Sequence, residues 1–184
     1  MKSFKIGVIS DTHVPDRSPE ISQDFLETIK SEKVDLLLHA GDISVPQVLS
    51  LLESIAPVKA VIGNRDFLLL GKIPMVLQFE VFGVKFGLMH GHMNFFIYWF
   101  DKFQYILRGY DRERYTSRLS KATPDANVII FGHTHHAENF WQNDILYFNP
   151  GSITYGDTLT RQRTWGLIEV YENGQVSGKI ISCG

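Results

Sequence analysis

Residues 4–13 read Phe-Lys-Ile-Gly-Val-Ile-Ser-Asp-Thr-His, an apolar run of β type that breaks into a polar segment. Two later apolar runs, at 34–39 and 58–62, break in the same way, at Gly41-Asp42 and at Gly63-Asn64-Arg65-Asp66. Apolar residues at helical spacing follow the first two runs, with Pro19 and Pro46 expected in the first turns of the helices. Strand–loop–helix units of this kind predict an α/β architecture with a parallel portion of sheet.

The second half of the chain is richer in strand patterns than the first. Strands are expected at 76–82, 84–89, 127–131, 145–148, 165–171 and 175–182. The first two should form a hairpin that turns at Gly83, and Asn173-Gly174 predicts a type I′ turn before the last strand. The pattern contains no linker or internal repeat, so we expect one domain spanning residues 1–184.

Composition narrows the function classes. The 184 residues are 44% hydrophobic and 21% charged, which is typical of a globular protein. A formal net charge of −2 argues against stable nucleic-acid binding. The longest aromatic-apolar run, 95–100, is too short to span a bilayer, and the N-terminal residues show no signal-peptide pattern. With Cys183 as the single cysteine, we expect a cytoplasmic protein that does not associate with membranes.

An aromatic and basic insert at about 94–121 is the least familiar segment. It carries six Lys or Arg residues against three Asp or Glu residues, with aromatic residues at helical spacing. One interpretation is a helix with a packed aromatic face and a solvated charged face. A second is a lid that steers an anionic substrate, and a third is a contact that joins two copies in a homo-oligomer.

The seven histidines gather near the ends of the expected strands. They stand beside Asp, Asn and Gly, at positions 13, 39, 90, 92, 133, 135 and 136. Carboxylate, amide oxygen and imidazole without thiolate are typical ligands of Mn²⁺, Fe²⁺, Co²⁺, Ni²⁺ or Zn²⁺. Because these candidates outnumber the ligands of one tetrahedral site, two ions that share a carboxylate are the simplest arrangement. Phosphate-binding loops, dinucleotide-binding loops and nucleophile elbows have no match in the sequence.

The order of these motifs resembles that of the calcineurin-like metallophosphoesterases. The matching segments are Asp11-Thr12-His13, Gly41-Asp42, Gly63-Asn64-Arg65-Asp66, His90-Gly91-His92, Gly132-His133-Thr134-His135 and Phe148-Asn149-Pro150-Gly151-Ser152. The chain is most similar to the small prokaryotic phosphodiesterase branch, which also resembles the retromer subunit Vps29. The resemblance covers most of the chain and implies two mixed β-sheets packed face to face and flanked by helices.

The resemblance also implies a ligand set and a reaction. One metal ion would be held by Asp11, His13, Asp42 and His135, and a second by Asp42, Asn64, His90 and His133. Asp42 would bridge the two ions, for which Mn²⁺ is expected first and Ni²⁺, Co²⁺, Fe²⁺ or Zn²⁺ are alternatives. The implied reaction is hydrolysis of a phosphoester, most readily a phosphodiester, by a hydroxide that bridges the ions.

The residues expected to act in catalysis are Asp42, Asn64, Arg65, His90 and His92. Arg65 departs from the family, many of whose members have a histidine there as proton donor. A guanidinium stays protonated and cannot be a general acid, but it can bind a phosphate oxygen or stabilise a leaving oxyanion. The alternative is a surface arginine paired with Asp66.

Three histidines are not expected to bind metal directly. His92 is expected to line the active site or to support the metal ligands. His39 is expected to pack beneath the loop after its strand, and His136 to point to solvent.

Two other functions compete with a phosphodiesterase. A scaffold of the Vps29 kind would keep the fold for protein contacts with little or no catalysis, although none of the expected ligands is missing here. A protein phosphatase is a third hypothesis, but the chain offers no evident substrate-docking domain.

Overall fold

The computed structural model describes residues 2–92, 112–157 and 160–183. Most of the insert predicted at 94–121 therefore lies outside the described residues, and only its end is seen, as helix α4 (Arg112–Ala122). Tyr115 and Leu119, which predicted a short helix here, lie on the buried face of α4. The boundaries of a single domain at 1–184 stay a prediction.

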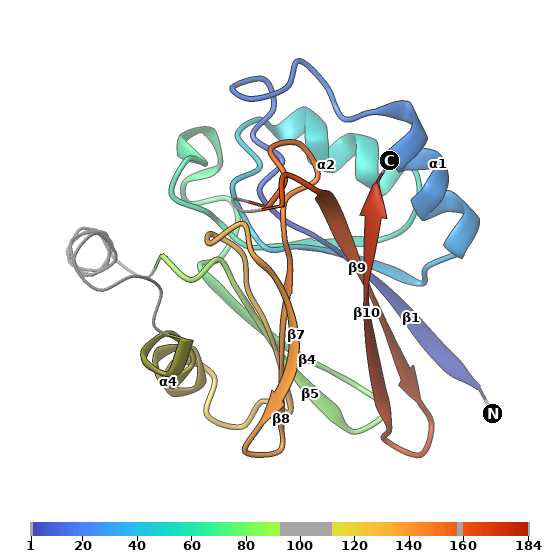
Figure 1. Cartoon of the computed structure of the whole chain (residues 1–184), viewed down its shortest axis with the longest axis vertical. Helices are drawn as coiled ribbons and strands as arrows, with labels where there is room; N and C mark the ends of the chain where they lie inside the picture. The colour runs from blue at the N-terminus through green and yellow to red at the C-terminus, as the bar shows by residue number, and fades with distance from the viewer. Residues whose placement is uncertain (1, 93–111, 158–159, 184) are drawn as a thin grey trace.

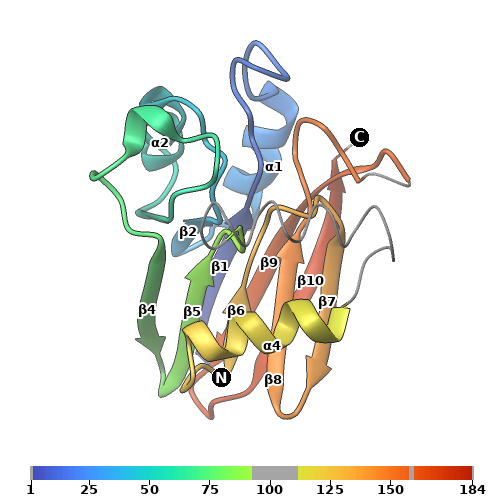
Figure 2. The same cartoon turned by 90° about the vertical axis from the view of Figure 1, so that its left-hand side faces the viewer.

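In the described residues, ten strands form two mixed five-stranded sheets (Figure 1, Figure 2). The first sheet has the order β10-β9-β1-β2-β3 and contains β1 (Ser3–Ile9), β2 (Leu36–His39), β3 (Val58–Ala60), β9 (Arg163–Tyr171) and β10 (Val176–Cys183). Its strands β1, β2 and β3 are parallel, whereas β9 runs antiparallel to β1 and to β10. The parallel portion predicted from the sequence is thus confirmed.

The second sheet has the order β4-β5-β6-β8-β7. It contains β4 (Val76–Val81), β5 (Val84–Met89), β6 (Val128–Ile130), β8 (Ile145–Pro150) and β7 (Ala137–Gln142). Strands β5, β6 and β8 are parallel, and the two edge strands β4 and β7 are antiparallel to their neighbours. Strand β7 was not expected from the sequence, because its residues Ala137–Gln142 show no clear apolar alternation.

Period-two alternation along β1 directs one set of side chains to each face of the first sheet. Ile6 and Val8 point to the second sheet, where they join a core that includes Phe86 and Phe148. Ile9 belongs instead to a core on the opposite face. Figure 1 shows the two sheets packed against each other, as the resemblance implied.

Helices cover the outer face of each sheet. Helix α1 (Gln23–Glu32) and helix α2 (Pro46–Glu53) lie against the first sheet, and α4 crosses the outer face of the second (Figure 2). Pro46 begins α2 as predicted. The prediction for Pro19 is wrong, because Ser22 caps α1 by accepting a hydrogen bond from the Phe25 amide at 3.3 Å.

Two hairpins have two-residue loops with a left-handed backbone at both positions, as a type I′ turn requires. These loops are Phe82-Gly83, between β4 and β5, and Asn143-Asp144, between β7 and β8. The type I′ prediction at Asn173-Gly174 is wrong. There only Gly174 has a positive φ, and the Tyr171 amide donates to the Gln175 carbonyl oxygen at 2.9 Å across a three-residue loop.

Close approach of the sheets requires glycine at one position of β9. A Cβ at Gly166 would overlap the ring of Phe148 from β8, and Gly178 of β10 lies against the same ring. Phe148 is fully buried, so the ring has no space into which to move. Among the described residues, no helix is long and apolar enough to cross a membrane.

Candidate metal centre

The parallel strands of both sheets direct their carboxyl ends into one group of loops. In open sheets of this kind, ligands bind beyond the carboxyl ends of the strands. The loops contain an unusual concentration of non-glycine residues with positive φ, namely Asp11, His13, Asp42, Ser44, His133 and His135. Such conformations cost free energy and concentrate at functional sites, where the surrounding structure holds them.

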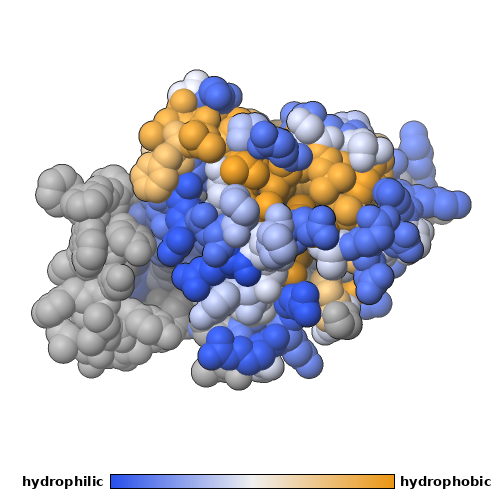
Figure 3. Space-filling model, turned by 90° about the horizontal axis from the view of Figure 1, so that it is seen from above, coloured by the Kyte–Doolittle hydropathy of each residue, from blue (hydrophilic) through white to orange (hydrophobic). Residues whose placement is uncertain are grey.

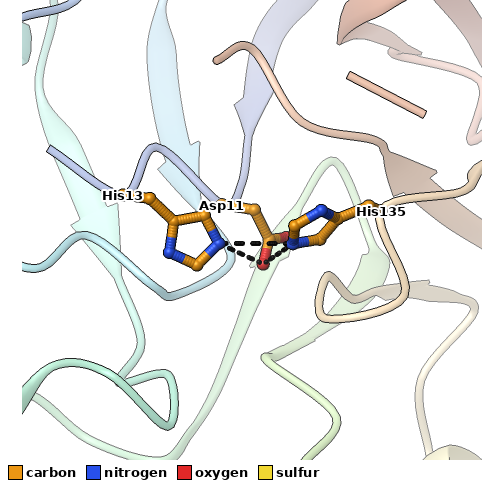
Figure 4. A group of neighbouring side chains, drawn as sticks. All are labelled: Asp11, His13 and His135. Carbon is orange, nitrogen blue, oxygen red and sulfur yellow. Dashed lines mark hydrogen bonds and ion pairs between the residues drawn. The ribbon is translucent and has the colours of Figure 1, made fainter. Parts of the chain in front are cut away.

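Asp11, His13 and His135 form the first donor cluster (Figure 4). The Nε2 atoms of His13 and His135 lie 3.2 Å apart, and Nε2 of His135 lies 3.2 Å from Oδ1 of Asp11. The loop after β1 supplies the first two residues, whereas the loop after β6 supplies His135. The structure thus joins residues more than 120 positions apart.

Asn64, His90 and His133 form the second donor cluster. Oδ1 of Asn64 lies 3.2 Å from Nε2 of His90 and 3.1 Å from Nδ1 of His133. The rings of His90 and His133 meet edge to face, with centroids 5.1 Å apart. These residues follow β3, β5 and β6, so this cluster also draws on both sheets.

Asp42 lies between the two clusters and faces each with a different oxygen. Its Oδ2 is 3.7 Å from Nε2 of His13, and its Oδ1 is 3.5 Å from Nε2 of His90. The backbone amide of Arg65 donates to the same Oδ1 at 2.9 Å, which fixes the carboxylate plane. All seven residues expected to bind metal therefore lie in one continuous group.

The electrostatics of the group favour added positive charge. Burial opposes charge on His90, but Asp42 and Asp11 outweigh burial and raise the pKa of His90 to about 9. Burial alone would raise the pKa of Asp42, yet the charges of His90 and His13 and the hydrogen bonds from His90 and the Arg65 amide together hold that pKa below its ordinary value. Burial and the charge of His90 lower the pKa of His133 to about 3. The carboxylates thus stay ionised beside a neutral imidazole.

The donor atoms fit a divalent cation. Oδ1 of Asp11 is buried, and the Nε2 atoms of His135 and His13 lie 3.2 and 3.7 Å from it. Burial also lowers the pKa of His13, which favours its neutral ring, and its Nε2 faces the same region. Unneutralised carboxylate oxygen and neutral imidazole nitrogen, without thiolate, are suitable ligands for borderline divalent ions. A cation here would add to the positive charge of His90, which otherwise balances the negative charge of Asp11 and Asp42.

A second layer of hydrogen bonds orients the donors. The Ser10 hydroxyl and the His133 amide donate to Oδ2 of Asp11, and Nδ1 of His90 donates to the Ala40 carbonyl oxygen at 2.7 Å. This last bond directs Nε2 of His90 toward Asn64 and Asp42. The imidazole therefore presents a defined nitrogen to the site.

Asp66 has a role that sequence reasoning did not identify. Its carboxylate is 1% exposed and accepts hydrogen bonds from the backbone amides of Asp42, Ser44 and Gly63, at 3.0, 2.7 and 2.7 Å. It therefore ties the loop after β2 to the loop after β3. Its place after Gly63-Asn64-Arg65 offers no pattern that separates it from a surface carboxylate.

The alternative interpretation named the wrong partner for Arg65, because Asp66 accepts hydrogen bonds from backbone amides, but it was right that the Arg65 side chain is exposed. Its Nη1 lies instead 3.7 Å from Oδ2 of Asp16, and both side chains are largely exposed. The Arg65 side chain thus lies at the mouth of the site, and its backbone amide is the part that contacts Asp42.

The remaining histidines divide into three cases. His92 lies beside the second cluster, with its ring centroid 5.3 Å from that of His90, and burial with the His90 charge lowers its pKa to about 4. His39 is fully buried beneath the loop, as expected, and its Nδ1 accepts from the Gly41 amide. The expectation for His136 is wrong, because its Nδ1 lies 3.1 Å from Oδ2 of Asp157 and its side chain is only 18% exposed.

Comparison with known proteins identifies the family. Residues 4–173 match the calcineurin-like phosphoesterase superfamily domain. A probable metallophosphoesterase of Methanothermobacter thermautotrophicus is 36% identical over 150 residues, which cover 81% of this chain and 77% of that protein. The chain therefore belongs to the calcineurin-like phosphoesterase superfamily.

Solved structures agree with this assignment. The structure of Vps29 from Cryptosporidium parvum superposes with a TM-score of 0.73 at 20% identity, over 99% of this chain and 98% of that chain. At 20% identity, this similarity shows that the two proteins share a fold. The structure of a novel archaeal phosphodiesterase superposes with a TM-score of 0.65 at 26% identity, over 97% of this chain and 100% of that chain.

Replacement of Asp66 by alanine should destabilise the protein and loosen the site. Three buried amides would lose their acceptor, and each unsatisfied buried donor costs about 1–3 kcal/mol. We expect the free energy of unfolding to fall by at least about 3 kcal/mol in urea titrations, with weaker Mn²⁺ binding by calorimetry. Asp125→Ala, which removes an exposed carboxylate, is the control. Equal stability and metal affinity of the two variants would contradict this role for Asp66.

Proposed function

We propose that this chain is a phosphodiesterase that uses two divalent metal ions, with Mn²⁺ as the preferred ion. The observation that carries the proposal is the position of Asp42, whose two oxygens face two separate donor clusters. A carboxylate placed in this way is suited to bridge two ions. One ion would use the donors on only one side of Asp42, and the donors on its other side are suited to hold a second ion.

The proposed ligands follow the two clusters. Asp11, His13, Asp42 and His135 would hold one ion, and Asp42, Asn64, His90 and His133 the other. When bound, two such ions lower the pKa of a water molecule, orient the phosphorus atom and stabilise the charge of the transition state. Phosphoryl transfer depends mainly on positioning and electrostatics, so the reaction requires no nucleophile from the protein.

Two further side chains beside the metal ligands have proposed roles, Arg65 on the substrate and His92 on the ligands. Arg65 is placed to bind a phosphate oxygen or the leaving oxygen, because its guanidinium is exposed and Arg65 lines the same groove as Asn64. His92 would support the second cluster through His90 and His133, whose ring centroids lie 5.3 and 6.5 Å from its own. It is neutral over a wide pH range, since its pKa is lowered to about 4.

Similarity to an archaeal phosphodiesterase supports diesters over monoesters as substrates. The second candidate function is a Vps29-like scaffold, which is supported by the Vps29 folds among the solved structures and by a Schizosaccharomyces pombe Vps29 that is 26% identical over 148 residues. The complete donor set favours the enzyme, because a scaffold has no need to keep buried ionised carboxylates together.

A cytoplasmic location and a homo-oligomer formed through the insert also stay proposals.

The test is metal-dependent turnover of bis-p-nitrophenyl phosphate by the purified protein. We expect Mn²⁺ to support turnover and elemental analysis to find two ions per chain. Asp42→Ala should lose turnover and both ions because the shared carboxylate is gone, whereas Asp125→Ala should keep them. One ion per saturated chain, retained by Asp42→Ala, would contradict the two-ion site, and no turnover with Mn²⁺, Ni²⁺, Co²⁺, Fe²⁺ or Zn²⁺ would favour the scaffold.

Arg65 gives a separate prediction about the leaving group. A guanidinium cannot donate a proton, so alkyl diesters should react slowly and aryl diesters with acidic leaving groups quickly. Arg65→Ala should lower kcat/KM by about 30- to 1000-fold, the effect of losing one electrostatic donor of about 2–4 kcal/mol. Arg65→His should flatten the dependence on leaving-group pKa, since imidazole can act as an acid. The measurement is kcat/KM for a series of diesters, plotted against the pKa of the leaving group. If wild type and both variants show the same slope in this plot and the same rates, Arg65 has no part in the reaction.

A further inference from the structure

Residues 150–154 lie at the carboxyl end of β8 and include the end of the last motif by which the sequence resembles its family. None of them is a proposed metal ligand, yet two of their hydroxyls contact the loop after β1. The Ser152 hydroxyl donates to the Asp11 carbonyl oxygen at 2.8 Å. The Thr154 hydroxyl donates to the Thr12 carbonyl oxygen at 2.8 Å and lies 3.2 Å from that of Asp11. Both side chains therefore bind the backbone that carries a carboxylate of the first donor cluster.

The loop after β1 depends on these partners because of its backbone conformation. Asp11 and His13 have positive φ angles of 53° and 48°, which persist only where the surrounding structure holds them. The amides of these two residues donate to the carbonyl oxygens of Gly41 and Asp42, each at 3.0 Å. The carbonyl oxygens of Asp11 and Thr12 accept instead from the two hydroxyls. The loop after β2 and residues 150–154 thus hold different polar groups of the same short loop.

Residues 150–154 are themselves tied to the start of β9. The Thr164 hydroxyl donates to the Pro150 carbonyl oxygen at 2.7 Å, and the Thr164 amide donates to the Ser152 carbonyl oxygen at 3.1 Å. Between these two bonds the chain turns at Gly151, where φ is 75° and a Cβ would overlap the Thr164 hydroxyl. The Ser152 hydroxyl is therefore presented from a backbone that is fixed on both sides.

The two hydroxyls act on the backbone of the site and not on its surface. Seen from above, the surface at this end of the molecule combines hydrophilic and hydrophobic side chains (Figure 3). Ser152 contributes nothing to that surface because it is fully buried, and its hydroxyl also accepts from the Tyr155 amide at 3.0 Å. Within the described residues, the two hydroxyls donate to the carbonyl oxygens of Asp11 and Thr12 and to no residue of the second donor cluster.

We propose that Ser152 and Thr154 are positioning residues for the first metal ion, the one that Asp11 would hold together with His135. The inference rests on the proposed two-ion site. Nε2 of His135 lies 3.2 Å from Oδ1 of Asp11 and comes from a different loop, so a shift of the Asp11 backbone would separate the two ligands. Groups that orient metal ligands contribute to metal affinity although they do not touch the metal. The second ion, whose other ligands follow β3, β5 and β6, should depend much less on these hydroxyls.

Two background variants isolate one ion each. Asn64→Ala removes a ligand that only the second ion would use, and His135→Ala removes one that only the first ion would use. In each background, Thr154→Val removes a hydroxyl and keeps the volume of the side chain. By calorimetric titration with Mn²⁺, we expect Thr154→Val to weaken binding about ten-fold in the Asn64→Ala background, the lower end of the effect of losing a group that orients a ligand. In the His135→Ala background the change should stay within about two-fold, as for independent sites.

Three further variants control the comparison. Thr154→Ser keeps a hydroxyl and should bind Mn²⁺ as its background does, whereas Ser152→Ala should weaken the first ion as Thr154→Val does. Thr123→Val is the matched control, because Thr123 is fully buried and its hydroxyl donates to the Leu119 carbonyl oxygen at 3.2 Å at the end of α4. It should change neither affinity. Urea titration shows whether each variant is folded, and if Ser152→Ala is not, the two Thr154 variants decide.

Equal weakening in both backgrounds would give the hydroxyls a general structural role and overturn the proposal, and so would no weakening in the Asn64→Ala background. The measurement is independent of turnover. If Thr154→Val acts only in the Asn64→Ala background but no diester is hydrolysed, the positioning role stands and the proposed reaction fails. If His135→Ala binds no Mn²⁺, the two-ion site fails, and the Asn64→Ala comparison alone decides whether the hydroxyls position the ligands.

Discussion

The buried carboxylate of Asp42 is the constraint on which the rest of the site depends. An ionised group that is 3% exposed is costly unless hydrogen bonds and opposite charge surround it. Here the Arg65 amide and the charge of His90 supply part of that compensation. The fold therefore has to bring β2, β3 and β5 together at their carboxyl ends, and the packing of the two sheets does this. A metal ion on each side of the carboxylate would complete the compensation.

Three glycines make this close assembly sterically possible. A Cβ at Gly41 would come within 2.7 Å of the His90 ring, and a Cβ at Gly63 would overlap Oδ1 of Asp42. At Gly132 it would overlap the Ser10 hydroxyl, which donates to Asp11. The glycines within the motifs therefore have a steric role, since each allows its loop to approach a side chain that belongs to another loop of the site.

Much of this site could be predicted because its ligands follow strands in short motifs. The motif order placed Asp11, Asp42 and His90 correctly at strand ends, and their resemblance to a known family implied the two sheets. Contacts across the fold were less predictable. Asp66 resembles any polar loop residue until its three amide partners are seen, and the partnership of His136 with Asp157 joins loops that no local pattern connects.

Hairpin turns and the edge strand β7 were also poorly predicted, because strand register rather than loop composition decides them. Asn173-Gly174 has the composition of a type I′ turn, but the pairing of β9 with β10 leaves three residues in the loop, and register decides the turn type. Conversely, Asn143-Asp144 forms the two-residue loop of a hairpin whose first strand, β7, lies at a sheet edge with Asn139 and Trp141 exposed.

The most direct test of the account is anomalous diffraction from crystals of the Mn²⁺-loaded protein. The account predicts two manganese peaks about 3.5–4 Å apart, the spacing typical of two-metal sites. One peak should lie next to Oδ2 of Asp42 on the His13 side, and the other next to Oδ1 on the His90 side. A single peak, or two peaks that do not share Asp42, would contradict the claim that this carboxylate organises a dinuclear centre.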